Sequence, residues 1–342
     1  MMFTYHFSMS HELIFLLDSQ MATFFCRFIH QVFQFQLPAP PTAPRSTITS
    51  NSNYKAPYGT VYKARDLHNN GQIVAMKKVK VALTEDGIPL STVREIALLR
   101  QLEAYRHPNI VRLLDVCHGG QSMERDHQLV LFLVFEHVEQ DLDSYLKRAP
   151  GPLSENRIRS MSYDILSGVD FLHSHRIVHR DLKPHNLLVT STGRVKLADF
   201  GLAKTYDTEM KLTSVVVTLW YRPPEVLLGV SYNTAVDVWS CACVLAQLHT
   251  RAPLLQADCD SQQLHAIFRL IGRPPRHEWP DNVAIVADSF PDYPPQDLAH
   301  VLPRIHPHAL DMIRGMLVFD PAKRLTALDC LEHPYFTEEP LK

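Results

Sequence analysis

The sequence predicts a two-lobed α+β fold, with a small lobe rich in strands followed by a larger, mainly helical lobe. After residue 54 the chain first shows clusters of β-forming residues, whereas beyond residue 140 most periodic segments have the repeat of a helix. The chain has 342 residues. At about 150 residues per domain, this length fits two domains or one large two-lobed unit.

The first 53 residues fit neither lobe. Residues 1–37 are rich in Phe, Leu and Ile, but their uninterrupted apolar run, Leu13–Leu17, is far shorter than the roughly 20 residues of a membrane span. No Lys or Arg precedes that run, as a secretory signal would require. Residues 38–53 are rich in Pro, Ser, Thr and Asn, a composition that buries no core. We therefore predict a disordered N-terminal extension and linker over 1–53, without signal or anchor.

The small lobe is expected over residues 54–135. Its predicted strands are 60–64, 73–79, 110–116 and 129–135. An Asn-Asn-Gly turn at 69–71 joins the first two as a hairpin. Residues 89–104 carry apolar side chains at steps of three, which predicts a helix.

The large lobe is expected over residues 141–337, after a hinge at 136–140. Its predicted helices are 154–173, 233–249, 260–271 and 307–318.

Composition excludes several classes of function. With 34 Lys and Arg against 36 Asp and Glu, the net charge is −2, so no basic field attracts nucleic acid. The six cysteines are scattered, which indicates a reducing compartment. The histidines have no cysteine or carboxylate partner at zinc spacing, and we expect no metal site built on them.

Short motifs that carry chemistry occur in a fixed order along the chain. Val74-Ala-Met-Lys77 lies on a predicted strand, and His179-Arg-Asp-Leu-Lys-Pro-His-Asn186 follows much later. Asp199-Phe-Gly201 begins thirteen residues after Asn186. Together they form the signature set of protein kinases. The alternative, a solvated charged face, would gather these polar residues by accident.

The residue types in these motifs match the needs of phosphoryl transfer, which depends on charge neutralisation and alignment. Asp199 and Asn186 offer the hard oxygen ligands that Mg²⁺ prefers. Asp181 can accept or orient the proton of a substrate hydroxyl, and Lys183, two residues on, can contact the transferred phosphate. These four residues are our candidates for metal binding and catalysis.

Lys77 supplies a cation for the α- and β-phosphates of a nucleotide, and its long side chain needs a carboxylate to hold it in place. Glu95, on the helix that follows the lysine strand, is the candidate partner.

From about residue 54 to 337, the sequence resembles the cyclin-dependent protein kinases, and most closely their 4 and 6 branch. The segments that carry the resemblance are 89–95, 133–142 and 212–222. It implies a two-lobed kinase fold that binds ATP and Mg²⁺, and a role in G1 cell-cycle control in the nucleus and cytoplasm. It also implies a D-type cyclin, kinase inhibitor proteins and Ser/Thr-Pro substrates as partners, with no nucleic acid and no membrane. The ATP-binding positions implied are Gly59, Val61, Ala75, Lys77, Phe135, Glu136, Val138, Asp141 and Leu188.

The same resemblance implies regulatory positions. Leu90 and Val93 fall where the helix meets the cyclin, although packing into the core is the other possibility for such a helical stripe. Thr213 falls at the activation phosphosite, with Arg94, Arg180 and Lys204 around its phosphate. Tyr58 falls at an inhibitory phosphosite beside the ATP phosphates. Glu225 is expected to pair with Arg324, as a structural tie.

The glycine-rich loop departs from the family pattern. Only Gly59 remains of the three glycines, because Tyr54 and Ala56 occupy the other two positions. A strand leading into this loop is not recognisable. Glycine lets backbone N–H groups approach phosphates, so two functions stay open. One is an active cyclin-dependent kinase, and the other is a kinase-like scaffold that binds cyclins or inhibitors and turns over ATP poorly.

Overall fold

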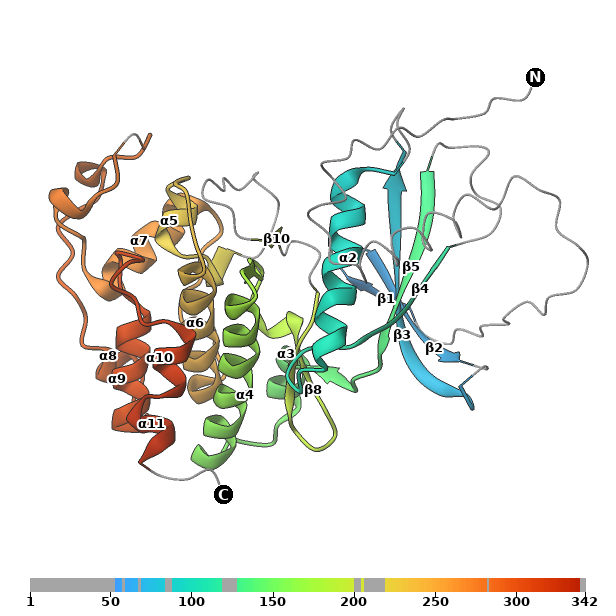
Figure 1. Cartoon of the computed structure of the whole chain (residues 1–342). Coiled ribbons are helices and arrows are strands. Elements are labelled where there is room, and N and C mark those ends of the chain that lie inside the picture. The colour runs from blue at the N-terminus through green and yellow to red at the C-terminus, as the bar shows by residue number, and fades with distance from the viewer. Residues whose placement is uncertain are drawn as a thin grey trace, which may run out of the picture. The chain divides into compact units, whose positions relative to one another are not determined.

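The computed structural model describes residues 53–56, 59–66, 69–83, 88–118, 128–199, 204–205, 219–281 and 283–338. The chain divides into two compact units (Figure 1). The first comprises Met1–Tyr105 and Leu113–Phe135, and the second comprises Arg106–Arg112 and Glu136–Lys342. We describe each unit by itself.

The first unit contains a five-stranded sheet in the order β1-β2-β3-β5-β4 and the helix α2 (Figure 1). Its elements are β1 (Asn53–Ala56), β2 (Gly59–Asp66), β3 (Gln72–Ala82), α2 (Leu90–Tyr105), β4 (Leu113–His118) and β5 (Gln128–Glu136). The predicted hairpin is confirmed: β2 pairs antiparallel with β3, from Val61↔Lys77 to Asp66↔Gln72. At its turn Asn70 and Gly71 adopt left-handed φ values of 53° and 72°, as an Asn-Gly turn favours.

Strand β1 corrects one expectation. The sequence shows no recognisable strand before the glycine loop, yet Asn53–Ala56 pairs antiparallel with β2, from Asn53↔Tyr62 to Ala56↔Gly59. Backbone pairing with the edge of an existing strand needs no apolar side-chain pattern. The Ser/Thr/Asn composition therefore concealed this strand.

The core of the first unit lies between the sheet and α2. Ile96 of α2 packs with Val81, Leu129 and Leu131 of the strands, and all four are buried. Leu99 and Leu102, at further steps of three, are buried as well, whereas Val93 is half-buried. The predicted helical stripe is therefore largely core.

The second unit is mainly helical. Its helices are α3 (Leu142–Arg148), α4 (Glu155–Ser174), α5 (Pro224–Leu227), α6 (Ala235–Thr250), α7 (Asp260–Ile271), α8 (Leu298–Val301), α9 (Pro307–Met316), α10 (Ala327–Leu331) and α11 (Pro334–Thr337). Its short strands are β6 (Gln140–Asp141), β7 (Ile177–Val178), β8 (Leu187–Val189), β9 (Val195–Leu197) and β10 (Lys204–Thr205). All four predicted helices of the large lobe are confirmed, with ends shifted by at most two residues.

The predicted strand over 110–116 is divided between the units. Ile110 forms a parallel bridge with Leu197 of β9, whereas β4 begins only at Leu113. A continuous apolar run cannot show this change of partner, because both halves are buried.

Helix α6 forms the centre of the second unit. Every residue from Ala235 to Leu248 is buried, and α6 contacts both α4 and α9. A helix that is buried on all sides is expected to be apolar all round. Asp237 is an exception to this rule in the first turn of α6.

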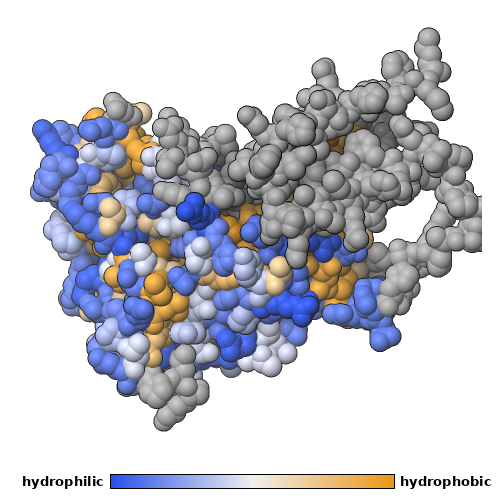
Figure 2. Space-filling model, in the orientation of Figure 1, coloured by the Kyte–Doolittle hydropathy of each residue, from blue (hydrophilic) through white to orange (hydrophobic). Residues whose placement is uncertain are grey.

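The surface of the second unit is largely hydrophilic on the face shown in Figure 2, with a hydrophobic band in the region of α4 and α10. Tyr163 of α4 and Leu328 of α10 are exposed large apolar side chains. Among the residues that the structure describes, no helix has both the length and the apolar character needed to cross a membrane.

Gly168 lets α4 pack closely against β9. A Cβ atom at this position would lie 2.7 Å from Leu197 Cδ1 and 3.0 Å from the main-chain oxygen of Asn109. Leu197 is fully buried, so its side chain can move aside only by displacing the atoms packed around it. We expect Gly168→Ala to lower the free energy of unfolding by about 1–3 kcal/mol, because it overpacks the interior. Urea denaturation will measure this, with Gly151→Ala, where a Cβ meets nothing within 4 Å, as the control that should change little.

The half-buried His249 makes the stability of the second unit sensitive to pH. Burial lowers the pKa of His249, the charge of Glu155 opposes this shift, and that of His306 adds to it. The hydroxyl of Tyr335 donates to Glu155 Oε1 at 2.7 Å, which ties α11 to α4 at the carboxylate whose charge acts on His249.

Because the folded pKa of His249 lies below the unfolded value of about 6.5, the unfolded state takes up the proton first. The stability contributed by neutral His249 is therefore complete above the unfolded pKa and falls as the pH drops below it. We expect a lower urea midpoint at pH 5.5 than at pH 7.5, and a smaller difference in His249→Gln. His300→Gln, at an exposed position, is the control; an unchanged pH dependence in His249→Gln would contradict the assignment.

Candidate functional site

A catalytic loop follows β7 in the second unit. It runs from His179 to Lys183 and ends in a 3-10 turn over Pro184–Asn186, after which β8 begins. The main-chain N–H of Asn186 donates to the oxygen of Lys183 at 2.9 Å, which closes the turn. Because the proline fixes its own φ, the turn brings Asn186 back toward Asp181.

Three of the predicted catalytic and metal residues meet in this loop. The Lys183 Nζ atom donates to Asp181 Oδ1 and Oδ2, at 3.1 and 2.8 Å. The Asn186 Nδ2 atom donates to Asp181 Oδ2 at 2.8 Å. All three side chains are at most 7% exposed. The Asp181 carboxylate is therefore held in one orientation by a cation and an amide.

The same geometry fits Asn186 and Asp199 as Mg²⁺ ligands. Asn186 Nδ2 also donates to the main-chain oxygen of Asp181, at 2.7 Å, so its Oδ1 is the atom that can coordinate a metal. The peptide before Asp199 is tied to the loop: the N–H of Ala198 donates to the oxygen of Asn186 at 2.9 Å, and His179 Nε2 lies 3.0 Å from the oxygen of Ala198. Both residues offer the oxygen ligands that Mg²⁺ prefers.

Asp237 anchors the catalytic loop from α6. Its Oδ2 accepts the main-chain N–H of His179 and its Oδ1 that of Arg180, both at 2.8 Å. Burial opposes ionisation of this carboxyl, but the hydrogen bond from His173, the charges of His173 and His179 and the N–H of Arg180 together hold its pKa below the usual value. The anchor is therefore a carboxylate.

The predicted hinge residues lie at the start of the second unit. Glu136 Oε1 accepts the N–H of Arg112 at 2.9 Å and Lys196 Nζ at 2.6 Å. Asp141 pairs across β6 and β8 with Leu188, so two of the predicted ATP-binding positions are neighbours. The Asp141 carboxylate caps α3 by accepting the N–H and the hydroxyl of Ser144, at 2.9 and 2.7 Å. Val138 is half-buried.

The first unit holds the lysine strand. Lys77 on β3 lies opposite Val61 on β2, and Gly59 lies opposite Ala56 on β1. Ala75, Phe135 and Lys77 are half-buried. Three further predicted positions lie on the backbone of α2, namely Leu90, Arg94 and Glu95, and their side chains are outside the described part of the structure.

The activation elements are described only in part. Tyr58 and Thr213 lie outside the described residues. Lys204, on β10, pairs through its backbone with Val178, next to the catalytic loop. The guanidinium of Arg180 lies over the ring of Tyr232, 5.6 Å from its centroid. The backbone thus brings Lys204 and Arg180 to the same region.

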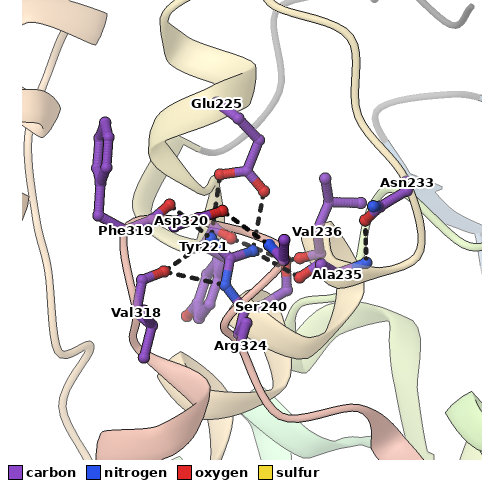
Figure 3. Close-up of polar contacts among 11 residues, drawn as sticks. Tyr221, Glu225, Asn233, Ala235, Val236, Ser240, Val318, Phe319, Asp320 and Arg324 are labelled. Atoms are coloured by element: carbon purple, nitrogen blue, oxygen red, sulfur yellow. Dashed lines mark hydrogen bonds and ion pairs between the residues drawn. The ribbon is translucent and has the colours of Figure 1, made fainter. Parts of the chain in front are cut away.

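The expected pair of Glu225 and Arg324 is confirmed (Figure 3). Arg324 donates to the two carboxylate oxygens of Glu225 at 2.8 and 3.1 Å. It also donates to main-chain oxygens of Ala235, Val318 and Phe319. Both side chains are buried, Arg324 fully. One side chain therefore joins α5, the start of α6 and the loop before α10.

Sequence reasoning missed Asp237 and His173 as functional residues. The signal for Asp237 was present: an acidic residue among apolar ones in a helix whose other residues indicate complete burial, where an unpaired charge is costly. His173 carries no such signal, because a histidine near the end of a helix is common in any fold.

Comparisons with known proteins agree with this geometry. Residues 56–336 match the family described as Protein kinase domain. Cyclin-dependent kinase 4 of Xenopus laevis is 50% identical over 284 residues, which cover 83% of this chain and 88% of the relative. Cyclin-dependent kinase 4 of Rattus norvegicus is 49% identical over 286 residues, which cover 82% and 93%. The chain therefore belongs to the protein kinase family and to its cyclin-dependent branch, and it is a serine/threonine protein kinase.

Proposed function

We propose that this chain is an ATP- and Mg²⁺-dependent kinase of the proline-directed type, activated by a D-type cyclin and by phosphorylation of Thr213, and acting in G1 control. The observation that carries the proposal is the buried cluster of Asp181, Lys183 and Asn186, with Asp199 tied to it through Ala198. This cluster supplies the proton acceptor, the cation and the oxygen ligands that phosphoryl transfer needs.

Each residue has one task in this reaction. Asp181 orients the hydroxyl of a substrate serine or threonine and accepts its proton as the hydroxyl oxygen bonds to the γ-phosphorus. Lys183, held on Asp181, offers a positive charge to the transferred phosphoryl group. Asn186 and Asp199 would hold Mg²⁺, which neutralises the phosphates when bound.

Activation by the cyclin is proposed to act on α2. Lys77 must pair with Glu95 to hold the α- and β-phosphates, and both belong to the first unit. A partner at Leu90 and Val93 would favour the position of α2 in which this pair forms. A phosphate on Thr213 would bind Arg94, Arg180 and Lys204 and order the activation segment. Lysine at 204 lacks the planar fork of arginine and would hold this phosphate less tightly.

The alternative proposal is a kinase-like scaffold that binds cyclins or inhibitor proteins. Its specific support is the departure from the glycine-rich pattern, where Tyr54 and Ala56, both on β1, replace glycines. With the catalytic cluster intact, loss of this phosphate cover should raise the KM for ATP more than it lowers kcat. We therefore favour the active kinase, located in the nucleus and cytoplasm, with Ser/Thr-Pro proteins as its substrates.

The test is phosphorylation of a Ser-Pro peptide by the purified chain bound to a D-type cyclin and phosphorylated on Thr213. A Ser-Ala peptide is the matched control for proline direction. A second protein carries a strand and glycine loop of the family type in place of residues 1–59. Activity in both proteins supports the active kinase, and activity only in the second supports the scaffold. Activity in neither would overturn both the kinase proposal and the roles given to Asp181 and Lys183.

A further inference from the structure

We propose that Arg251 is a positioning residue for the nucleotide: it holds the C-terminal end of α3 and, through that helix, Asp141 at the other end. The inference rests on the kinase function proposed above and deepens it. Arg251 directly follows α6, as its C-cap residue. It belongs to none of the motifs that predicted the site, and it lies 105 and 102 positions from the two residues that it contacts at the end of α3.

The backbone at Arg251 is strained. Its φ is 63°, in the left-handed region, and its N–H donates to the oxygen of Gln247 at 2.7 Å. A helix that ends in this conformation usually has glycine at that position, because a Cβ atom costs free energy there. Glycine would end α6 equally well, so the backbone conformation does not explain an arginine. The strain points to a contribution from the side chain.

The Arg251 side chain completes the C-terminal end of α3. Its Nη2 atom donates to the main-chain oxygens of Leu146 and Ala149, at 2.7 and 2.8 Å. The last carbonyl groups of a helix have no partner within that helix. The residue four positions after Leu146 is Pro150, which has no N–H to donate. Arg251 therefore supplies hydrogen bonds that α3 cannot make for itself, and it places a positive charge where the helix dipole is negative.

Helix α3 depends on such ties because it has only seven residues. Isolated helices shorter than about 12 residues are marginal in water. Polar groups from outside the helix hold both of its ends: the carboxylate of Asp141 caps the first turn and the guanidinium of Arg251 the last. Because seven helical residues span only about 10 Å, a displacement of the last turn reaches the first.

Asp141 connects α3 to the nucleotide. Both hydrogen bonds to its carboxylate come from Ser144, in the first turn of α3. A carboxylate offers about four lone pairs, so Asp141 can still accept a hydrogen bond from a hydroxyl or amino group of the nucleotide. Its backbone is held separately, by pairing with Leu188. The position of α3 therefore sets the direction of the carboxylate, whereas the short sheet sets the position of its main chain.

The catalytic carboxylate is held independently of Arg251. Lys183 and Asn186, which belong to the same loop as Asp181, donate the three hydrogen bonds that orient it. Loss of the contact between Arg251 and α3 should therefore weaken nucleotide binding and leave the chemical step nearly unchanged.

Three variants separate this role from a general contribution to folding. Arg251→Gly removes the side chain and relieves the left-handed backbone, so α6 keeps its C-cap and the protein is expected to fold. Arg304→Gly is the matched control, because Arg304 has a φ of 68° at an exposed position between α8 and α9. Asp141→Asn keeps a residue that caps helices well but removes the charge that accepts from the nucleotide.

The first measurement is a double-mutant cycle in steady-state kinetics of the cyclin-bound full chain. We expect Arg251→Gly to raise the KM for ATP by about 3- to 10-fold with kcat within about twofold of the parent. In the Asp141→Asn protein the same change should raise this KM by less than about twofold, because the residue through which Arg251 acts is already altered. Arg304→Gly should match the parent. An unchanged KM in Arg251→Gly, or equal rises in both backgrounds, would overturn the proposal.

The second measurement needs no peptide phosphorylation. The N–H of Ala149, which donates to the oxygen of Tyr145, should exchange with solvent faster in Arg251→Gly than in Arg304→Gly. Calorimetry should show weaker binding of MgATP to Arg251→Gly. Equal exchange rates in the two variants would overturn the role of Arg251.

The same calorimetry distinguishes this proposal from the kinase function on which it rests. A parent protein that binds MgATP, and binds it more weakly as Arg251→Gly, supports the role of Arg251 even where the Ser-Pro peptide is not phosphorylated. That result would overturn the proposed kinase function alone. A parent protein that binds no MgATP would overturn both.

Discussion

Asp181→Asn is expected to lower kcat for peptide phosphorylation by about 10³-fold, while the KM for ATP changes little. The amide cannot accept the substrate proton. It also presents an NH₂ group to Lys183 Nζ or to Asn186 Nδ2, where the parent carboxylate accepts three hydrogen bonds. The substitution therefore impairs both the proton transfer and the hydrogen-bond geometry at residue 181. Initial rates with the cyclin-bound protein will measure the decrease in kcat.

The matched control for Asp181→Asn is Asp311→Asn. It makes the same chemical change on α9, at a side chain that is 66% exposed, and should leave kcat unchanged. A thermal melt of Asp181→Asn should show a folded protein. Turnover in Asp181→Asn equal to that of the parent would remove the proton-accepting role from Asp181.

Arg324→Leu is expected to lower the free energy of unfolding by about 3–5 kcal/mol, because it leaves the carboxylate of Glu225 buried without its cation. Glu225 is 5% exposed and Arg324 is fully buried. The three main-chain oxygens of Ala235, Val318 and Phe319 lose their donor in the same step. Urea denaturation followed by circular dichroism will measure the change.

The neighbouring residue supplies the control. Lys323 is exposed and pairs with Glu278 at 2.8 Å, and pairs of this kind contribute little to stability. Lys323→Leu should therefore unfold at nearly the parent midpoint. The double change of Glu225→Leu with Arg324→Leu should recover part of the loss, because no buried charge remains. An Arg324→Leu midpoint equal to that of Lys323→Leu would show that the buried pair does not stabilise the fold.

Much of the fold could be predicted from periodicity alone. The β2–β3 hairpin, α2 and the helices α4, α6, α7 and α9 are long enough to show their repeat. The short elements could not be predicted: α3 spans seven residues, and β6 and β7 two each. Elements of this length have no measurable period and form only because neighbouring strands and loops already lie beside them.

The candidate site also has a part that the sequence predicts and a part that depends on tertiary contacts. Asp181, Lys183 and Asn186 are close in sequence, and a turn closed by Pro184 brings them together, so their motif was sufficient to predict the cluster. Asp199 required one tertiary contact, between Ala198 and Asn186. The support from α6 required a contact between residues 57 and 58 positions apart, and no local pattern records such a contact.

By itself, the sequence determined which chemical groups this kinase carries and the order in which they occur. Residue types at fixed spacing are sufficient where a short turn brings them together. Only the tertiary structure decided how that loop is held. It showed that β1 forms from an unpatterned segment, that Arg180 is kept in a left-handed conformation, and that a buried carboxylate from α6, tied to His173 of α4, supports it. The physical reason is that a strained backbone and a buried charge are stable only when groups distant in the sequence meet them in the folded chain.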